Sequence, residues 1–321
     1  MISPRLLGRF ARFSTAILAI ASASSSLFAY VPKGDPQGPR APLAACVVGQ
    51  KWLALVTRED EIWLVSLDTG EQRLLSRGTQ ALAVAPADVD SFWVISNNGA
   101  VMLRMALTGR VVEQLVPPER VGEVVTVGGD IVVARMPFAA SGLLLWRGRP
   151  ASLQPWALPV ERFAADPASV ALANMVAVDS DGERVAVVWR LLRSEMALLD
   201  RDGRLRAMTT LPYYGASWAP LGFDPSLLSA GDVTVVPKPY ADVAMANQRV
   251  WCLSGQEGPW RDNDTRRGRH VVEVDLDGRI VHIHELRVDG CQLVVDGASR
   301  VLVVDCDLGL HPLPGRIEKQ P

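Results

Sequence analysis

The sequence of 321 residues lacks the motifs that mark the commonest catalytic sites. It contains no Gly-x-Ser-x-Gly elbow, no His-Glu-x-x-His pair and no phosphate-binding loop. Its four cysteines include no Cys-x-x-Cys spacing, so zinc and redox motifs are unsupported. We therefore name no catalytic residue or metal ligand, and we expect no cofactor.

An excess of one charge is also absent. The formal net charge is -2, and no basic stripe runs along the chain, which excludes a nucleic-acid partner on electrostatic grounds. Apolar residues make up 49% and charged residues 21%, as in folded globular proteins. Beyond the N-terminal segment no stretch is long and apolar enough to span a membrane.

The N-terminus has the order of a secretory signal peptide. Arg5, Arg9 and Arg12 form a positive stretch without acids, and the uncharged, apolar-centred segment Phe13 to Ala29 follows. Cleavage after Ala23 fits the small-residue pattern, and cleavage after Ala29 is the alternative. We assign residues 1–29 to the signal peptide and 30–42 to a linker, with an uncleaved membrane anchor as the rival interpretation. The mature protein is then periplasmic or secreted.

Residues 43–316 are dominated by short apolar runs rich in Val, Leu, Ile and Trp, and residues 317–321 form a tail. Examples are WLALVT from Trp52, SFWVIS from Ser91 and RVAVVWR from Arg184. Runs of this length, separated by turn residues, predict the strands of an all-β domain. No window shows a long helical stripe, so long helices are not expected.

A repeated turn distinguishes among the β architectures. Segments such as ALTGRVVEQLV and DLDGRIVHIHEL share a strand, a Gly-Arg turn and a second strand. The turn glycines are Gly70, Gly109, Gly148, Gly203 and Gly278, and the first three are 39 residues apart. This spacing is typical of one four-stranded propeller blade, with the turn between its third and fourth strands. Five tryptophans fall one in each of these blades: Trp63, Trp93, Trp146, Trp189 and Trp251.

Through these Asp-x-Asp-Gly-Arg turns the chain resembles the broad superfamily of bacterial exported β-propellers, without features of any one family. The repeat predicts six blades of four antiparallel strands, with five or seven as alternatives. Residues 288–313 supply only three strands of the last blade. We expect its outer strand to come from the N-terminal side, near residues 27–36 or 43–49, because such closure removes open sheet edges.

Cysteine and histidine spacing suggests two further features. Cys291 and Cys306 flank a hairpin and lie nearly opposite each other, so a cross-strand disulfide is predicted. Pairing of Cys46 with the last blade, or buried free thiols, are the alternatives. His282 and His284 are two residues apart on one strand and could share a face, but no spacing marks a third metal ligand.

The binding surface is predicted from loop length. Residues 212–230 and 254–268 exceed what a blade needs, and strand connectivity brings both loops to one rim of the ring. They carry these candidate binding residues: Tyr213, Tyr214, Trp218, Phe223, Trp260, Arg261 and Arg266. Aromatic and arginine side chains are favoured at interfaces, although the same side chains could simply pack the loops against the ring.

The leading functional hypothesis is therefore a non-catalytic propeller that binds a protein, peptide or glycan at this rim. The alternative is a propeller enzyme of hydrolase or lactonase type with a metal at the channel mouth. The two hypotheses differ in the channel. An enzyme requires several polar side chains that converge there, whereas a rim-binding protein does not.

Overall fold

The computed structural model describes residues 42–137, 141–160, 170–171, 173–214, 238–257 and 266–313. The predicted signal peptide, nearly all of the linker and the C-terminal tail lie outside these ranges. Among the helices of the described residues, none is long and apolar enough to cross a membrane.

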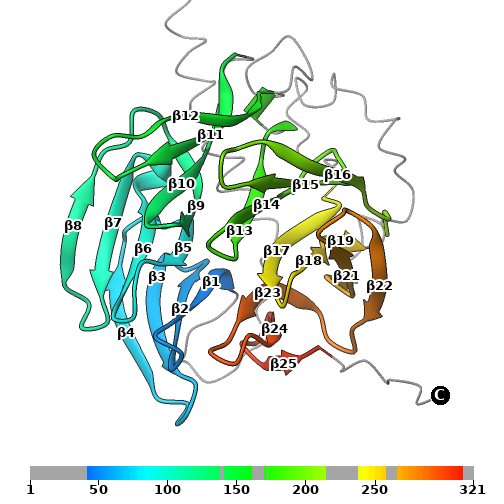
Figure 1. Cartoon of the computed structure of the whole chain (residues 1–321). Coiled ribbons are helices and arrows are strands. Elements are labelled where there is room, and N and C mark those ends of the chain that lie inside the picture. The colour runs from blue at the N-terminus through cyan, green and yellow to red at the C-terminus, as the bar shows by residue number, and fades with distance from the viewer. Residues whose placement is uncertain are drawn as a thin grey trace, which may run out of the picture.

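Six antiparallel sheets follow one another along the chain and surround a common axis (Figure 1). The first sheet contains β1 (Pro42–Val48), β2 (Trp52–Thr57), β3 (Glu61–Ser66) and β4 (Gln72–Arg77). The second contains β5 (Ala83–Pro86), β6 (Ser91–Ser96), β7 (Val101–Ala106) and β8 (Val111–Leu115). The third contains β9 (Val121–Val127), β10 (Asp130–Arg135), β11 (Leu143–Gly148) and β12 (Gln154–Pro159). The fourth sheet contains β13 (Val176–Ser180), β14 (Arg184–Trp189), β15 (Glu195–Asp200) and β16 (Leu205–Thr210). The fifth contains β17 (Tyr240–Ala246), β18 (Arg249–Ser254), β21 (His270–Asp275) and β22 (Ile280–Glu285). The sixth contains β23 (Gly290–Val295), β24 (Val301–Asp305) and β25 (Leu310–Pro312). A short pair, β19 (Gln256–Glu257) and β20 (Arg266–Arg267), lies between β18 and β21, and a 3-10 turn η1 (Asn97–Gly99) follows β6.

The chain is thus a six-bladed β-propeller, and the predicted fold class is confirmed. The first strands of the blades contact one another around the axis: β1 lies between β5 and β23, and β13 lies between β9 and β17. Of the two predicted sources for the outer strand of the last blade, residues 43–49 are wrong, and residues 27–36 lie outside the described part of the chain. Residues 43–49 form most of β1, the innermost strand of the first blade, because the short turn after Val48 pairs β1 directly with β2.

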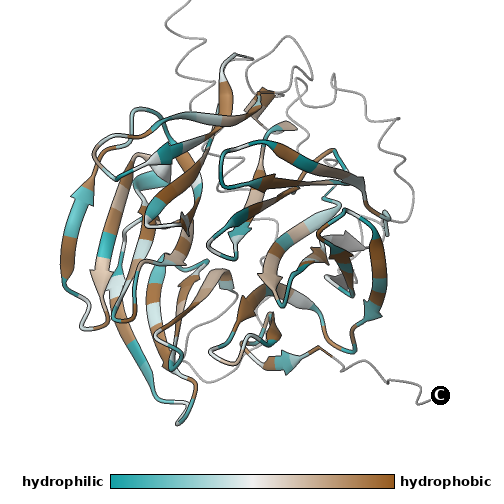
Figure 2. Cartoon of the chain, in the orientation of Figure 1, coloured by the Kyte–Doolittle hydropathy of each residue, from teal (hydrophilic) through white to brown (hydrophobic). Residues whose placement is uncertain are grey.

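Hydrophobicity decreases from the inner strands to the outer ones (Figure 2). The middle strands are buried almost throughout; β6, for example, is buried at all six positions. The outer strands β4, β8, β16 and β22 are largely exposed. This gradient follows from the packing of blades face to face, which covers the middle of each sheet and leaves its last strand against solvent. The five tryptophans of the repeat lie one in each of the first five blades.

The repeated turns join the third and fourth strands, as predicted. In the fourth blade, Asp200 Oδ1 accepts hydrogen bonds from the backbone N–H groups of Asp202 and Arg204, both at 2.9 Å. Gly203 has φ 82°, a left-handed conformation that glycine adopts without a Cβ clash. Asp275 holds the equivalent turn of the fifth blade through Asp277 and Arg279.

Three of the five turn glycines also lie close to the preceding blade. A Cβ on Gly203 would lie 2.9 Å from the indole of Trp156 in β12, and one on Gly278 would lie 2.8 Å from Ala207 in β16. A Cβ on Gly109 would lie 3.4 Å from Leu75 in β4. At these three turns glycine is therefore favoured both by the turn conformation and by the close approach of the neighbouring blade.

Candidate functional site

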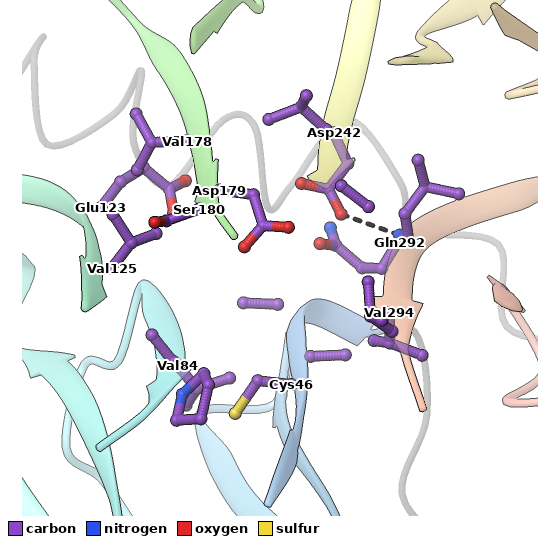
Figure 3. Close-up of a pocket in the computed structure, with 18 of the residues that line it drawn as sticks. Cys46, Val84, Glu123, Val125, Val178, Asp179, Ser180, Asp242, Gln292 and Val294 are labelled. Atoms are coloured by element: carbon purple, nitrogen blue, oxygen red, sulfur yellow. Dashed lines mark hydrogen bonds between the residues drawn. The ribbon is translucent and has the colours of Figure 1, made fainter. Parts of the chain in front are cut away.

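The six innermost strands enclose a cavity of about 230 Å³ on the propeller axis. Each of β1, β5, β9, β13, β17 and β23 contributes to its wall. Most of the lining is small or aliphatic, and it contains no aromatic side chain. Figure 3 shows the side chains of Asp179, Asp242 and Gln292 turned toward one open space, with Glu123 on the β9 side.

Glu123 is held by an arginine from the neighbouring blade. Arg190, just after β14, places Nη1 2.7 Å from Oε1 of Glu123. The Nε of Arg190 donates to the carbonyl oxygen of Ala241 at 3.0 Å. Arg190 therefore neutralises one carboxylate and connects the third, fourth and fifth blades.

Asp179 and Asp242 each support the next blade through one carboxylate oxygen. Oδ2 of Asp179 in β13 accepts a hydrogen bond from the N–H of Met245 in β17 at 2.7 Å. Oδ2 of Asp242 in β17 accepts from the N–H of Leu293 in β23 at 2.8 Å (Figure 3). Both residues thus have a structural role, while the carboxyl groups also line the cavity.

Gln292 continues the same pattern at the junction between the last and first blades. Its Nε2 donates to the carbonyl oxygen of Leu43 in β1 at 2.8 Å. On the other side of the ring, Thr126 Oγ1 in β9 donates to the carbonyl oxygen of Pro86 in β5 at 3.0 Å. Polar side chains beside the axis therefore link successive innermost strands by hydrogen bonds to backbone groups.

Burial controls the electrostatics of the three acids. It raises the pKa of Glu123 to about 7, and Arg190 acts in the opposite direction. Burial also raises the pKa of Asp179 to about 7, although the N–H of Met245 favours the ionised form. For Asp242 burial raises the pKa to about 6, again against Arg190. Ionisation of these groups in a poorly solvated cavity is costly, so a positively charged ligand would stabilise their charged forms.

The cavity also contains the buried thiol of Cys46 in β1, one of two free cysteines among the described residues. Burial raises the pKa of this thiol, with a smaller contribution from Asp179, so the neutral S–H form prevails. Its chemical role is that of a small apolar wall residue rather than a nucleophile.

The residues of the predicted rim fall largely outside the described part of the chain. Tyr213 and Tyr214 are described, whereas Trp218, Phe223, Trp260 and Arg261 are not. Arg266 lies in β20, which pairs with β19.

The described start of the first long loop contacts the strand that follows the second long loop. The N–H of Gly255 donates to the carbonyl oxygen of Pro239 at 2.8 Å, and the N–H of Gly268 donates to that of Gly255 at 2.8 Å. The Tyr214 ring stacks on His270 with centroids 4.0 Å apart. The Tyr214–His270 contact therefore links the first long loop to the start of β21, whereas the Gly255–Pro239 bond extends the pairing of β17 with β18.

The structure shows the pairing of the two predicted disulfide cysteines and the surroundings of His282 and His284. Cys291 and Cys306 form a disulfide with a Cα–Cα distance of 5.5 Å. His284 is buried, with Nε2 3.4 Å from Oε2 of Glu273, whereas His282 is exposed beside it. Within the described ranges no group of three or more His, Cys, Asp or Glu residues is arranged to hold a metal ion.

Sequence reasoning missed the cavity residues, although a weak signal exists. Glu123, Asp242 and Gln292 each occupy the third position of an otherwise mainly apolar first strand, and Asp179 occupies the fourth position of its strand. A single polar residue near the same position in the first strand of successive blades would have pointed to the axis. That signal becomes readable only once the first strand of each blade is known.

Comparisons with known proteins support the fold and nothing finer. No protein-family model matches the chain, and no curated protein matches it either. Among solved structures, a gluconolactonase from Xanthomonas campestris superposes with a TM-score of 0.55 at 15% identity, covering 86% of this chain and 87% of that one. Regucalcin from Agrobacterium tumefaciens, described as a calcium-binding protein, has a TM-score of 0.52 at 12% identity, with 84% and 83% covered. Virginiamycin B lyase from Staphylococcus aureus has a TM-score of 0.50 at 11% identity, with 87% and 86% covered.

Proposed function

We propose that the protein is a binding propeller that holds a small polar ligand in its axial cavity. The observation that carries this proposal is the convergence of Glu123, Asp179 and Asp242, from three successive blades, on one cavity lined by all six innermost strands. Pockets that bind small molecules are concave, largely apolar and provided with a few placed polar groups. This cavity has that composition.

The size and charge of the cavity restrict the ligand. A volume of about 230 Å³ is below the usual range for drug-sized ligands, roughly 300–1,000 Å³, so the ligand has few heavy atoms inside the ring. The three carboxylates accept hydrogen bonds, and only Arg190 opposes their charge in the lining. A ligand that carries a cation or several hydrogen-bond donors fits these features best.

The role of the same side chains in joining blades is the competing explanation, and the experiment separates the two. Calorimetric titration and thermal shift are measured with 1,4-diaminobutane, D-glucose and calcium chloride as probes. At about 100 times Kd, a bound probe stabilises the folded state by about 2.7 kcal/mol. Asp179→Asn keeps an oxygen for the Met245 N–H but removes the charge, so the variant should fold and lose the response. Asp277→Asn, on an exposed turn, is the matched control and should keep it.

The outcome also tests the enzyme alternative. A response to calcium together with hydrolysis of δ-gluconolactone, both lost in Asp179→Asn, would favour the lactonase-type enzyme with a metal. A response to diaminobutane or glucose without hydrolysis would favour the binding protein. If no probe binds, and Asp179→Asn differs from the parent only in stability, the cavity residues only hold neighbouring blades together, and the proposal is withdrawn.

A second candidate function is the capture of a protein, peptide or glycan at the rim formed by residues 212–230 and 254–268. The observation that favours it is the stacking of Tyr214, in the first of these loops, on His270, which lies two residues after the second. Loops supported in this way on a rigid scaffold are common places for partner binding.

A further inference from the structure

The charges around the axial cavity are of both signs. Among the lining residues that the structure describes, Arg190 is the basic one, and it forms an ion pair with Glu123. Asp179 and Asp242 instead accept hydrogen bonds from backbone N–H groups, and within the described ranges neither forms an ion pair with arginine or lysine. A cationic group of a ligand would therefore supply the partner that these two carboxyl groups lack.

Three hydrogen-bond acceptors from successive blades surround the same open space. Asp179 in β13, Asp242 in β17 and Gln292 in β23 turn their side chains toward it (Figure 3). Each aspartate uses Oδ2 to hold the next blade, and because a carboxylate accepts several hydrogen bonds, Oδ1 can accept another. Gln292 uses Nε2 to hold Leu43, which leaves its Oε1 as an acceptor. These three side chains supply one acceptor for each N–H of an ammonium group.

Arg190 has more donors than its contacts with the protein use. Its Nη1 lies 2.7 Å from Glu123, and its Nε donates to the carbonyl oxygen of Ala241. The guanidinium fork carries further N–H groups, which can bind an anion. Burial raises the pKa of Glu123 to about 7, so near neutral pH part of this carboxyl group is protonated and leaves the charge of Arg190 unpaired. A carboxylate fits the fork and, with its single charge, suits an acidic cavity better than a phosphate does.

The rest of the wall restricts the chain that links the two charges of the ligand. The lining between the polar groups is small or aliphatic, with Val124, Val178 and Val294 among its side chains. The cavity volume is about 230 Å³. A short aliphatic chain fits this space and this composition, whereas an aromatic or long polar chain does not.

We propose that the ligand of the axial cavity is a small aliphatic amino acid. Its ammonium group binds Asp179, Asp242 and Gln292, and its carboxylate binds Arg190. This assignment rests on the proposed function, since it requires that the cavity holds a ligand. It adds that the ligand carries both charges, whereas the acidic residues alone would accept any small cation.

The first test compares ligands that differ by one charged group, and it needs only the parent protein. Calorimetric titration uses L-alanine, β-alanine and 4-aminobutanoate, which differ in the separation of their charges, and propylamine and propanoate, which each carry one charge. At least one amino acid should bind about tenfold or more tighter than propylamine, because a hydrogen bond to a charged group contributes at least that factor. Propanoate should bind more weakly than propylamine. If no amino acid binds more tightly than propylamine, the proposal is overturned.

The second test changes the residue that is assigned to the carboxylate. Arg190→Lys keeps a positive charge beside Glu123 but removes the fork, so it should lower the affinity for the best amino acid by about tenfold and leave that for propylamine nearly unchanged. Asp179→Asn should weaken both ligands. Arg279→Lys, at an exposed turn, is the matched control and should change neither affinity.

The ratio of the two affinities is the readout, because weaker contacts between blades would affect both ligands alike. An unchanged ratio in Arg190→Lys would contradict the role assigned to Arg190. If amines bind as tightly as amino acids, the cavity still holds a ligand and only the amino-acid assignment is wrong. If neither the amino acids nor the amines bind, including 1,4-diaminobutane, the proposed function and this assignment both fail.

Discussion

Removal of the Cys291–Cys306 disulfide should lower the free energy of unfolding by about 3 kcal/mol. The bond closes a loop with a sequence separation of 15 residues. In the chain-entropy model a loop of this length loses about 3 kcal/mol of unfolded-state freedom at 25 °C. The expected decrease in melting temperature is about 5–10 °C, since a domain of this size shifts by only a few degrees per kcal/mol.

The experiment compares urea unfolding of the parent and of Cys291→Ala/Cys306→Ala, each with and without dithiothreitol. Reduction should bring the parent to the stability of the double variant and should leave the double variant unchanged. An unchanged double variant would show that the buried thiols of Cys46 and Cys252 contribute nothing to the effect of dithiothreitol on stability. Coincident transitions by fluorescence and circular dichroism check that unfolding is two-state.

The loss of stability should be concentrated in the sixth blade. Cys291 adjoins Gln292 and Leu293, which join the sixth blade to its two neighbours. Exchange of the Leu293 N–H should therefore accelerate more than that of the Met245 N–H, which Asp179 holds at the junction of the fourth and fifth blades. A double variant within about 0.5 kcal/mol of the oxidised parent would refute the argument that the bridge constrains the chain, because the model requires about 3 kcal/mol.

Three other predictions follow from the fold, the cavity and the rim. In urea unfolding, Gly203→Ala should lower the free energy of unfolding by about 1–3 kcal/mol more than Gly70→Ala does. Both glycines have positive φ, but only a Cβ on Gly203 would press against Trp156. Equal losses of stability in the two variants would exclude the contact between blades. Stability should fall as pH rises from about 4 to about 7, because the raised pKa values of Glu123, Asp179 and Asp242 make the folded state bind more protons than the unfolded one. Asp179→Asn should reduce this slope by up to about 1.4 kcal/mol per pH unit, and an unchanged slope would contradict the assignment. Trp260→Ala should leave the melting temperature nearly unchanged while weakening partner capture in pull-down from an exported-protein fraction; loss of folding instead would identify Trp260 as a packing residue.

Much of the fold is visible in local sequence. The 39-residue spacing of Gly70, Gly109 and Gly148 reports a blade length, since the turn between the third and fourth strands needs a residue with positive φ at the same point in every blade. The assignment of residues 43–49 to an outer strand failed for an equally local reason. An apolar run at the start of a ring reads the same whether it begins the first blade or completes the last one.

What the sequence by itself determined is therefore the repeating unit: short buried strands, Asp-Gly turns and their order along the chain. These depend on interactions between residues a few positions apart, such as Asp200 with the N–H of Arg204. The axial cavity was decided only by tertiary structure. Glu123, Asp179 and Asp242 are more than fifty residues apart from one to the next, and they meet because the ring places the first strand of every blade at its centre. No local pattern encodes that convergence, and the same burial that brings the three carboxyl groups together raises their pKa values.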